Sequence, residues 1–173
     1  MPRLSDISNA ATVDLIGNAS LAKAVLAINA ASAATVKTTT ALLYTVNGVM
    51  YTKAILSAQA ITPTHTQNGA VSGGSYVQPV STTVYYTLSA NAAGTIAVTQ
   101  GTFAGQDLSL MNSGASVRGD GSVPDAPDLY TPFGVIKVVT NASTTFTAGT
   151  TALDAAGLTV SYFDVAVLPA GAL

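Results

Sequence analysis

The strongest constraint on the fold is one dipeptide, Asn47-Gly48, which stands between two runs rich in β-forming residues, "ALLYTV" and "VMYTKAIL". A type I′ turn needs positive φ at both central residues, and Asn-Gly is well suited to adopt it. A two-residue loop also fixes the strand register, so the sequence predicts an antiparallel hairpin over residues 41–56. The expected cross-strand pairs are Val46 with Val49, Thr45 with Met50, and Tyr44 with Tyr51.

Both faces of this hairpin are apolar. Successive side chains of a strand point to opposite faces, so the residues divide into two sets. The set expected to face the core is Leu42, Tyr44, Val46, Val49, Tyr51 and Ile55, interrupted by Lys53. The other set is Ala41, Leu43, Thr45, Met50, Thr52, Ala54 and Leu56, with no charged member. A solvated face would carry charged side chains, so we expect a partner to cover the second face.

The composition of the whole chain agrees with that of the hairpin. Its 173 residues are 49% hydrophobic and 8% charged, whereas about 25% is usual for soluble domains. Every acidic residue is Asp, and Thr, Ser, Val, Gly and Ala dominate, which indicates a mainly β protein. The low charge has two interpretations, a neutral surface of small polar side chains or a surface covered by other copies or a partner. We favour the second, because soluble monomers normally keep charge against association.

Charge and hydropathy exclude several classes of partner. The formal net charge is −2, and the Lys and Arg residues are scattered singly, so no nucleic-acid surface is expected. No run of about 18 apolar residues exists, so no membrane partner is expected. The stretch "LAKAVLAINAASAA" imitates a secretory leader, but Lys23 and Asn29 interrupt it. Without Cys the chain has neither disulfides nor thiolate ligands.

The N-terminal part differs in composition from the rest. The stretch "ASLAKAVLAINAASAA" (19–34) is rich in Ala and repeats Leu21, Val25 and Ile28 at helical spacing, which predicts a helix. Thr-rich sequence begins at Thr35. We therefore expect a helical or extended arm over residues 1–34 and a β-sandwich domain over residues 35–173. The helix could cap the core of its own domain or pack on a neighbouring subunit.

Further strands are expected along the second part. Candidates are "TVYYTLSA" (83–90) and "GTIAVTQGTF" (94–103), joined at Asn91, then "FGVIKVVT" (133–140), "STTFTAG" (143–149) and "LTVSYFDVAVL" (158–168). Turn residues separate these short segments. The predicted fold class is mainly β, an antiparallel β-sandwich or jelly-roll-like domain with an N-terminal Ala-rich arm.

The residues offer little to catalysis. His65 is the single histidine and stands in "TPTHTQNG", where a solvent-exposed loop position is expected. The nearest approach to a nucleophile elbow, "GASVR" (114–118), lacks its final Gly. Zinc needs several His or Cys ligands, which the chain cannot supply, and no phosphate-binding glycine loop occurs. We therefore expect no enzyme and no cofactor.

The loop over residues 111–132 carries two weak motifs. Arg118-Gly119-Asp120 matches a cell-adhesion tripeptide, and Asp120, Asp125 and Asp128 could offer oxygen ligands to calcium. Their spacing fits no EF-hand loop, so we expect a tight turn with a solvated ion pair and no metal. Two N-x-S sequons, at Asn18 and Asn141, occur near the rate that chance predicts.

Two longer stretches resemble a known class of protein. "KTTTALLYTVNGVMYTKA" and "PFGVIKVVTNASTTFTAGTTALDAAGLTVSYFDVAVLP" are similar in style to the capsid decoration, or cement, proteins of tailed bacteriophages. The resemblance covers most of residues 37–169. It implies a virion structural protein without catalysis, bound to the outer surface of the major capsid protein shell and commonly trimeric. It supplies no site residues.

Contacts with sister subunits or the capsid are expected on faces that carry small or apolar side chains and no charged ones. The candidates are Leu21, Val25 and Ile28 of the predicted helix, and Leu43, Met50 and Leu56 of the outer hairpin face. The alternative function is a receptor-binding or fibre module of a phage that touches a host surface through residues 111–132. A secreted carbohydrate-binding sandwich is a third possibility, which the absence of Trp disfavours.

Overall fold

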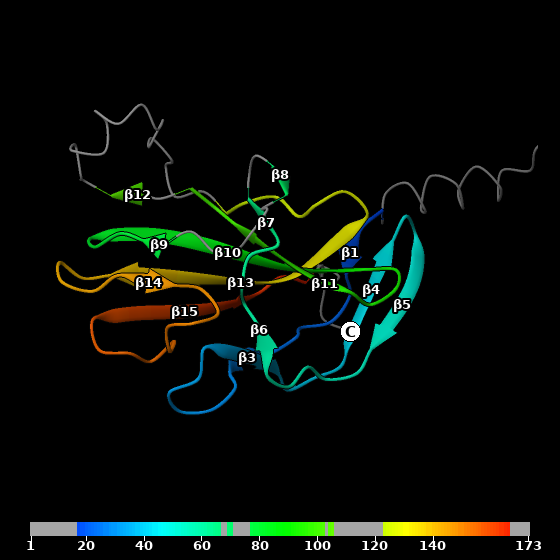
Figure 1. Cartoon of the computed structure of the whole chain (residues 1–173). Coiled ribbons are helices and arrows are strands. Elements are labelled where there is room, and N and C mark those ends of the chain that lie inside the picture. Colours follow the sequence, from blue (N-terminus) through cyan, green and yellow to red (C-terminus); the bar gives the residue numbers. More distant parts are fainter. Residues whose placement is uncertain (1–16, 67–68, 71–76, 103, 106–122, 167–173) are drawn as a thin grey trace, which may run out of the picture.

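The computed structural model describes residues 17–66, 69–70, 77–102, 104–105 and 123–166, and their regular elements are strands in mainly antiparallel sheets (Figure 1). The mainly β class is therefore confirmed. The longer strands are β4 (Leu42–Val46), β5 (Val49–Lys53), β10 (Thr82–Asn91), β11 (Ile96–Gln100), β13 (Tyr130–Thr140) and β15 (Leu158–Asp164). The shorter strands are β1 (Ala19–Ser20), β2 (Leu26–Ile28), β3 (Thr35–Thr38), β6 (Gln59–Ala60), β7 (His65–Thr66), β8 (Gly69–Ala70), β9 (Val77–Gln78), β12 (Ala104–Gly105) and β14 (Phe146–Thr147).

The largest sheet is built around β10 and β13, the two longest strands of Figure 1. Its order is β15-β13-β10-β11-β7-β8, and β12 also pairs with β10. The pairings are antiparallel except that of β7 with β11, which is parallel. The β10–β11 hairpin turns just after Asn91, whose side chain accepts a hydrogen bond from the Thr95 amide at 2.9 Å. The strands predicted at 83–90, 94–103, 133–140 and 158–168 are thus found with shifted ends.

The predicted hairpin is confirmed in its turn and its register. Asn47 and Gly48 have φ of 50° and 75°, the positive values that a type I′ turn requires. β4 pairs with β5 through Tyr44 opposite Tyr51 and Val46 opposite Val49. On its other side β4 pairs with β1, giving a sheet of order β1-β4-β5. The two-residue turn leaves no freedom in register, which is why local sequence sufficed.

The helix predicted over residues 19–34 is wrong. Those residues contain β1 and β2, which pair with β4 and β3 respectively. Val25 has a φ of 51°, outside the helical region, and lies between two positions that reach the core, Ala24 and Leu26. Helix propensity is a weak preference, and here strand pairing overrides it. Of the expected arm, residues 17–34 share sheets with later strands, whereas residues 1–16 lie outside the described part of the chain.

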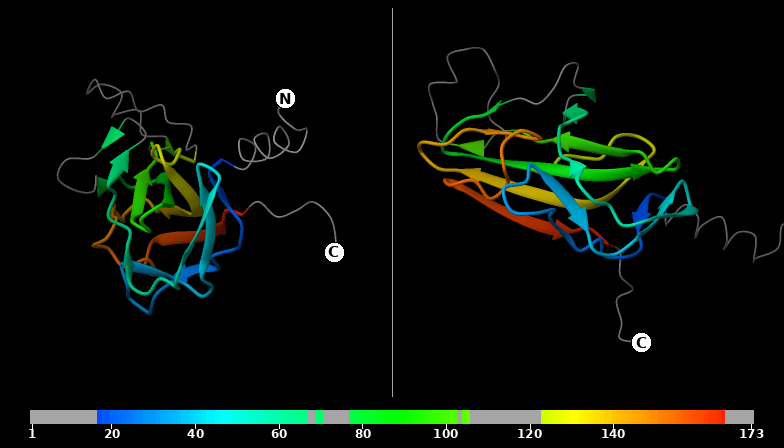
Figure 2. Two further views of the ribbon diagram at one scale, coloured as in Figure 1. Left: turned by 90° about the vertical axis from the view of Figure 1, so that its right-hand side faces the viewer. Right: turned by 60° about the horizontal axis from the view of Figure 1, so that its bottom comes forward.

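A common interior receives side chains from most of these sheets. Viewed along the strands in the left panel of Figure 2, the coloured segments surround it. Its largest fully buried side chains are Tyr44, Tyr86, Phe133 and Phe146. The rings of Tyr86 and Phe146 pack edge to face, with their centres 6.0 Å apart. β2 crosses β13 so closely that a Cβ on Gly134 would lie 3.0 Å from Leu26 Cδ2. Glycine at that strand position admits the neighbouring segment.

Hydrogen bonds connect the early segments to the late ones. The Asp164 carboxylate accepts from the Leu26 amide at 3.0 Å, and the Asp154 carboxylate accepts from the Ser32 amide at 2.8 Å. The Thr131 hydroxyl donates to the Thr45 carbonyl. These bonds join segments more than 80 residues apart in sequence, so the described residues form one continuous structure. Within that part of the chain, no helix is long and apolar enough to cross a bilayer.

Candidate functional site

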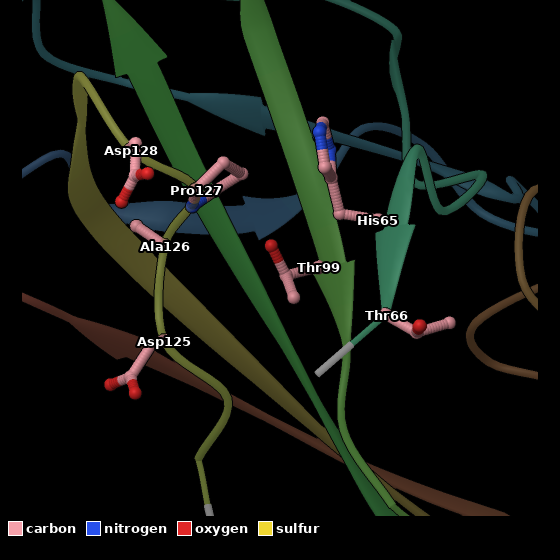
Figure 3. Close-up of a pocket in the computed structure, with 7 residues that line it drawn as sticks. All are labelled: His65, Thr66, Thr99, Asp125, Ala126, Pro127 and Asp128. Atoms are coloured by element: carbon pink, nitrogen blue, oxygen red, sulfur yellow. The ribbon is translucent and has the colours of Figure 1, made fainter. Parts of the chain in front are cut away.

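One shallow groove brings titratable side chains together. Its volume is about 290 Å³, and its lining is His65, Thr66, Thr99, Asp125, Ala126, Pro127 and Asp128 (Figure 3). The parallel pairing of β7 with β11 places His65 beside Thr99. The segment before β13 carries the two carboxylates across from that histidine. Asp125 and Asp128 are both exposed at the groove.

The histidine differs from its predicted setting. His65 lies in β7 and is half-buried, because β7 pairs with β11, whereas a solvent-exposed loop position was expected. Its Nδ1 lies 2.9 Å from the Thr64 hydroxyl oxygen, and its ring centre lies 6.4 Å from that of Tyr130. The same Thr64 hydroxyl accepts from the Val98 amide at 3.2 Å. The threonine thus ties the histidine to β11.

The described residues of the groove give the His65 side chain a single hydrogen-bond partner. In the described residues His65 has a hydrogen bond to Thr64 and none to a carboxylate, so no residue orients the imidazole as the third member of a triad does. The described residues likewise include no group of three His, Cys, Asp or Glu side chains placed to hold a metal ion. Asp120, the third member of the predicted Asp set, lies outside the described residues, as does the Arg118-Gly119-Asp120 motif.

A second candidate is a surface of apolar side chains on the β4–β5 hairpin. We call Val49, Met50 and Ile55 the hairpin surface; their exposed fractions are 55%, 62% and 60%. Val49 and Met50 are consecutive residues of β5, so their side chains point to opposite faces of the hairpin, and Ile55 follows the strand. Tyr51, on the same face of β5 as Val49, stacks on Tyr44 with ring centres 6.0 Å apart. Large apolar side chains gathered on one exposed element are typical of contact sites.

The division of the hairpin into two faces is only partly correct. Leu42, Tyr44 and Val46 are buried as predicted, but Val49 and Ile55, assigned to the same face, are exposed. The core covers β4, the middle strand of its sheet, more fully than β5, the edge strand. Strand alternation reports which face a side chain is on, and it does not report how far the core extends beneath that face.

The six predicted contact residues occupy different environments. Leu21 and Leu43 are half-buried neighbours, joined by a hydrogen bond from the Leu21 amide to the Leu43 carbonyl at 2.7 Å. Val25 and Met50 are exposed at 43% and 62%. Ile28 packs against the core, and Leu56 lies inside it, only 8% exposed.

The burial of Leu56 has a local cause. β5 ends at Lys53, so the alternation that placed Leu56 on the outer face does not reach it. Its amide donates to the Thr38 hydroxyl at 3.0 Å, and its carbonyl accepts from the Thr38 amide at 3.1 Å. These two hydrogen bonds to Thr38 hold Leu56 with its side chain in the core. Sequence reasoning missed Val49 and Ile55 as exposed apolar residues, although their place beside the turn and beyond Lys53 was a usable signal.

Comparisons with known proteins add no relative. No protein-family model matches the chain, and neither the curated protein sequences nor the solved structures contain a match.

Proposed function

We propose that the protein is a virion structural protein that decorates and cements the outer surface of a phage capsid by binding the major capsid protein shell. The observation that carries the proposal is the hairpin surface, apolar and exposed in a chain of which only 8% is charged. Contacts repeated over a whole shell favour uncharged surfaces, because each buried charge would have to be desolvated. The resemblance of residues 37–169 to decoration proteins points the same way.

The proposal includes no catalysis, no cofactor and no nucleic-acid partner. For catalysis the support is that His65 hydrogen-bonds to Thr64 and, among the described residues, to no carboxylate; for nucleic acid it is the scattered Lys and Arg residues. A structural role asks for a rigid β framework and contact surfaces rather than for reactive side chains. The self-association implied by the resemblance, commonly trimeric, belongs to the same proposal.

We further propose that the sheets form a sandwich of the jelly-roll kind. The support is the shared interior, to which β3, β4, β10 and β13 all contribute buried side chains. We retain residues 1–16 as an attachment arm. They precede Gly17, whose carbonyl accepts from the Gly48 amide at 2.8 Å at the tip of the hairpin.

The test is binding of the purified protein to empty capsid shells of the phage that encodes it, prepared without the protein. The expected result is saturable co-sedimentation and a higher temperature of shell rupture. Met50→Asp, which places a charge on the hairpin surface, should weaken binding at least tenfold. Val77→Asp is the matched control, because Val77 is 54% exposed on β9, and it should bind as the unchanged protein does.

Three results would contradict the proposal or its contact surface. Absence of co-sedimentation at micromolar protein would remove the capsid role. Binding to host cells or to isolated tails instead of shells would favour the receptor-binding alternative. Equal loss of binding in the Met50 and Val77 variants, both folded, would remove the hairpin surface from the contact.

A further inference from the structure

The outer edge of β5 is a free sheet edge. β5 is the last strand in the order β1-β4-β5, and within the described residues it pairs with β4 alone. A free edge presents backbone N–H and C=O groups that can pair with another strand. The groups on this edge follow from the register of the hairpin.

Met50 and Thr52 carry the outward-pointing groups. In a hairpin with a two-residue turn, the residues that flank the turn, Val46 and Val49, exchange hydrogen bonds with each other. Hydrogen-bonded pairs alternate along the ladder, so Tyr51 also bonds to β4 through its partner Tyr44. The amide and carbonyl of Met50 and Thr52 therefore point away from β4. Within the described residues no further hydrogen bond to these groups is found.

The usual protections of an edge strand are missing from β5. Such strands commonly carry a charged side chain, a proline or a bulge. β5 contains no proline, and its pairing with β4 runs without a shift in register. Its one charge, Lys53, is turned back toward its own subunit, since a Cβ on Gly94 would lie 3.5 Å from Lys53 Nζ.

We propose that this edge pairs antiparallel with β5 of a second copy, about a two-fold axis at Tyr51. Met50 then lies opposite Thr52 of the partner subunit, and each such pair exchanges two backbone hydrogen bonds. Tyr51 faces Tyr51 of the partner subunit in a pair without hydrogen bonds, which extends the Tyr44–Tyr51 stack across the interface. The interaction is closed, because both edges are used once.

Two copies of this edge fit each other without a conflict of charge, which favours a second copy over an unrelated strand. Met50 and Thr52 lie symmetrically on either side of Tyr51, so this edge is its own complement. The same register places Lys53 opposite Val49 of the partner subunit, so no two like charges meet. Val49 and Met50, 55% and 62% exposed in one copy, then stand on the two faces of the joined sheet, where they stay open to a shell. The pairing needs no capsid and so goes beyond the proposed function; a three-fold contact elsewhere on the surface is compatible with it.

A cysteine scan tests this register, because the chain contains no Cys and a single introduced thiol can react only with the same position in another copy. In an antiparallel pair without hydrogen bonds the Cα atoms are about 4.5 Å apart, within the range of a disulfide. Tyr51→Cys should therefore give mostly a covalent dimer on mild oxidation, reversed by reductant. Ala142→Cys, at an exposed turn, is the control and should stay mostly uncoupled. Equal coupling of the two variants would overturn the pairing.

A second pair of variants, at Thr52, tests the same pairing without the Tyr51→Cys substitution. Thr52→Pro removes an amide that points outward and would bond to the second copy. The variant should keep the circular dichroism spectrum of the folded protein, while the mass of the assembly measured by light scattering should fall by half. Thr52→Val keeps that amide and should keep the mass. A folded Thr52→Pro variant with unchanged mass would refute the pairing. If it still binds capsid shells when monomeric, the proposed function stands independently of this contact.

Discussion

Two buried tyrosines show how single hydroxyl groups fit this core. Tyr86 is fully buried against Phe146, and its hydroxyl has no hydrogen-bond partner among the described residues. Tyr44 is also buried, but its hydroxyl donates to the Asn91 carbonyl at 2.9 Å. Burial raises the pKa of both phenols, and the nearby Tyr51 adds to the rise at Tyr44. The same substitution should therefore have opposite effects at the two positions.

We predict that Tyr86→Phe leaves the free energy of unfolding unchanged or raises it by about 1 kcal/mol, because it removes an unpaired buried hydroxyl. Tyr44→Phe should lower it by about 1 kcal/mol, because a satisfied hydrogen bond is lost. Urea denaturation of the two variants beside the unchanged protein measures both. A Tyr86→Phe variant that is clearly the less stable of the two would show that the Tyr86 hydroxyl has a partner.

The raised pKa of Tyr86 also predicts a dependence on alkaline pH. The unfolded chain loses the phenol proton near the ordinary pKa of 10.0, whereas the folded chain holds it. Above pH 10 the unfolded state therefore binds fewer protons, and the loss of stability with pH should steepen toward about 1.4 kcal/mol per pH unit for this residue. Below pH 9 the contribution is constant. Tyr86→Phe should make the fall between pH 10 and 11 shallower, and identical slopes in the two proteins would contradict this account.

At the scale of elements, the sequence predicted best those turns and strands that neighbouring residues alone determine. The Asn47-Gly48 turn and the register of β4 and β5 follow from two residues and the alternation around them. β10, β13 and β15 were found because β-branched and aromatic runs identify strands without reference to partners. Their neighbours in the sheet depend on contacts distant in sequence, and no local pattern states them.

The helix predicted for the Ala-rich segment (19–34) was wrong for the same reason. Ala favours a helix in isolation, but β2 pairs with β3, and Leu26 packs against Gly134 of β13. The groove was also beyond the reach of sequence, because His65 and Asp125 come together only when β7 pairs with β11. The sequence singled out His65 and the pair Asp125 and Asp128 separately, and nothing in it brought them into one site.

Truncation separates the N-terminal arm from the strands that follow it. A chain starting at Thr35 lacks β1 and β2 together with the buried Ala24 and Leu26. Loss of one buried Leu side chain alone costs about 2–5 kcal/mol, so this truncation should unfold or aggregate. A chain starting at Gly17 keeps every described strand and should retain the β signal and cooperative melting. A stable, cooperatively folded chain starting at Thr35 would restore the original boundary between arm and domain.

At the scale of the whole molecule, a sparsely charged β framework leaves apolar side chains exposed at one hairpin and an unpaired strand edge beside them. Leu42 and Tyr44 of β4 belong to the core cluster, while Val49, Met50 and Ile55 of the same hairpin are exposed. A protein that acts by covering other copies and a shell has a use for both features.

The position of the protein in the mature particle tests the central claim most directly. A cryo-electron microscopy reconstruction of the phage that encodes it should show this β structure repeated over the outer surface of the capsid, in contact with the major capsid protein. Particles that lack the protein should lack that density and rupture at a lower temperature. Density confined to the tail or its fibres, or a head surface free of this structure, would contradict the account.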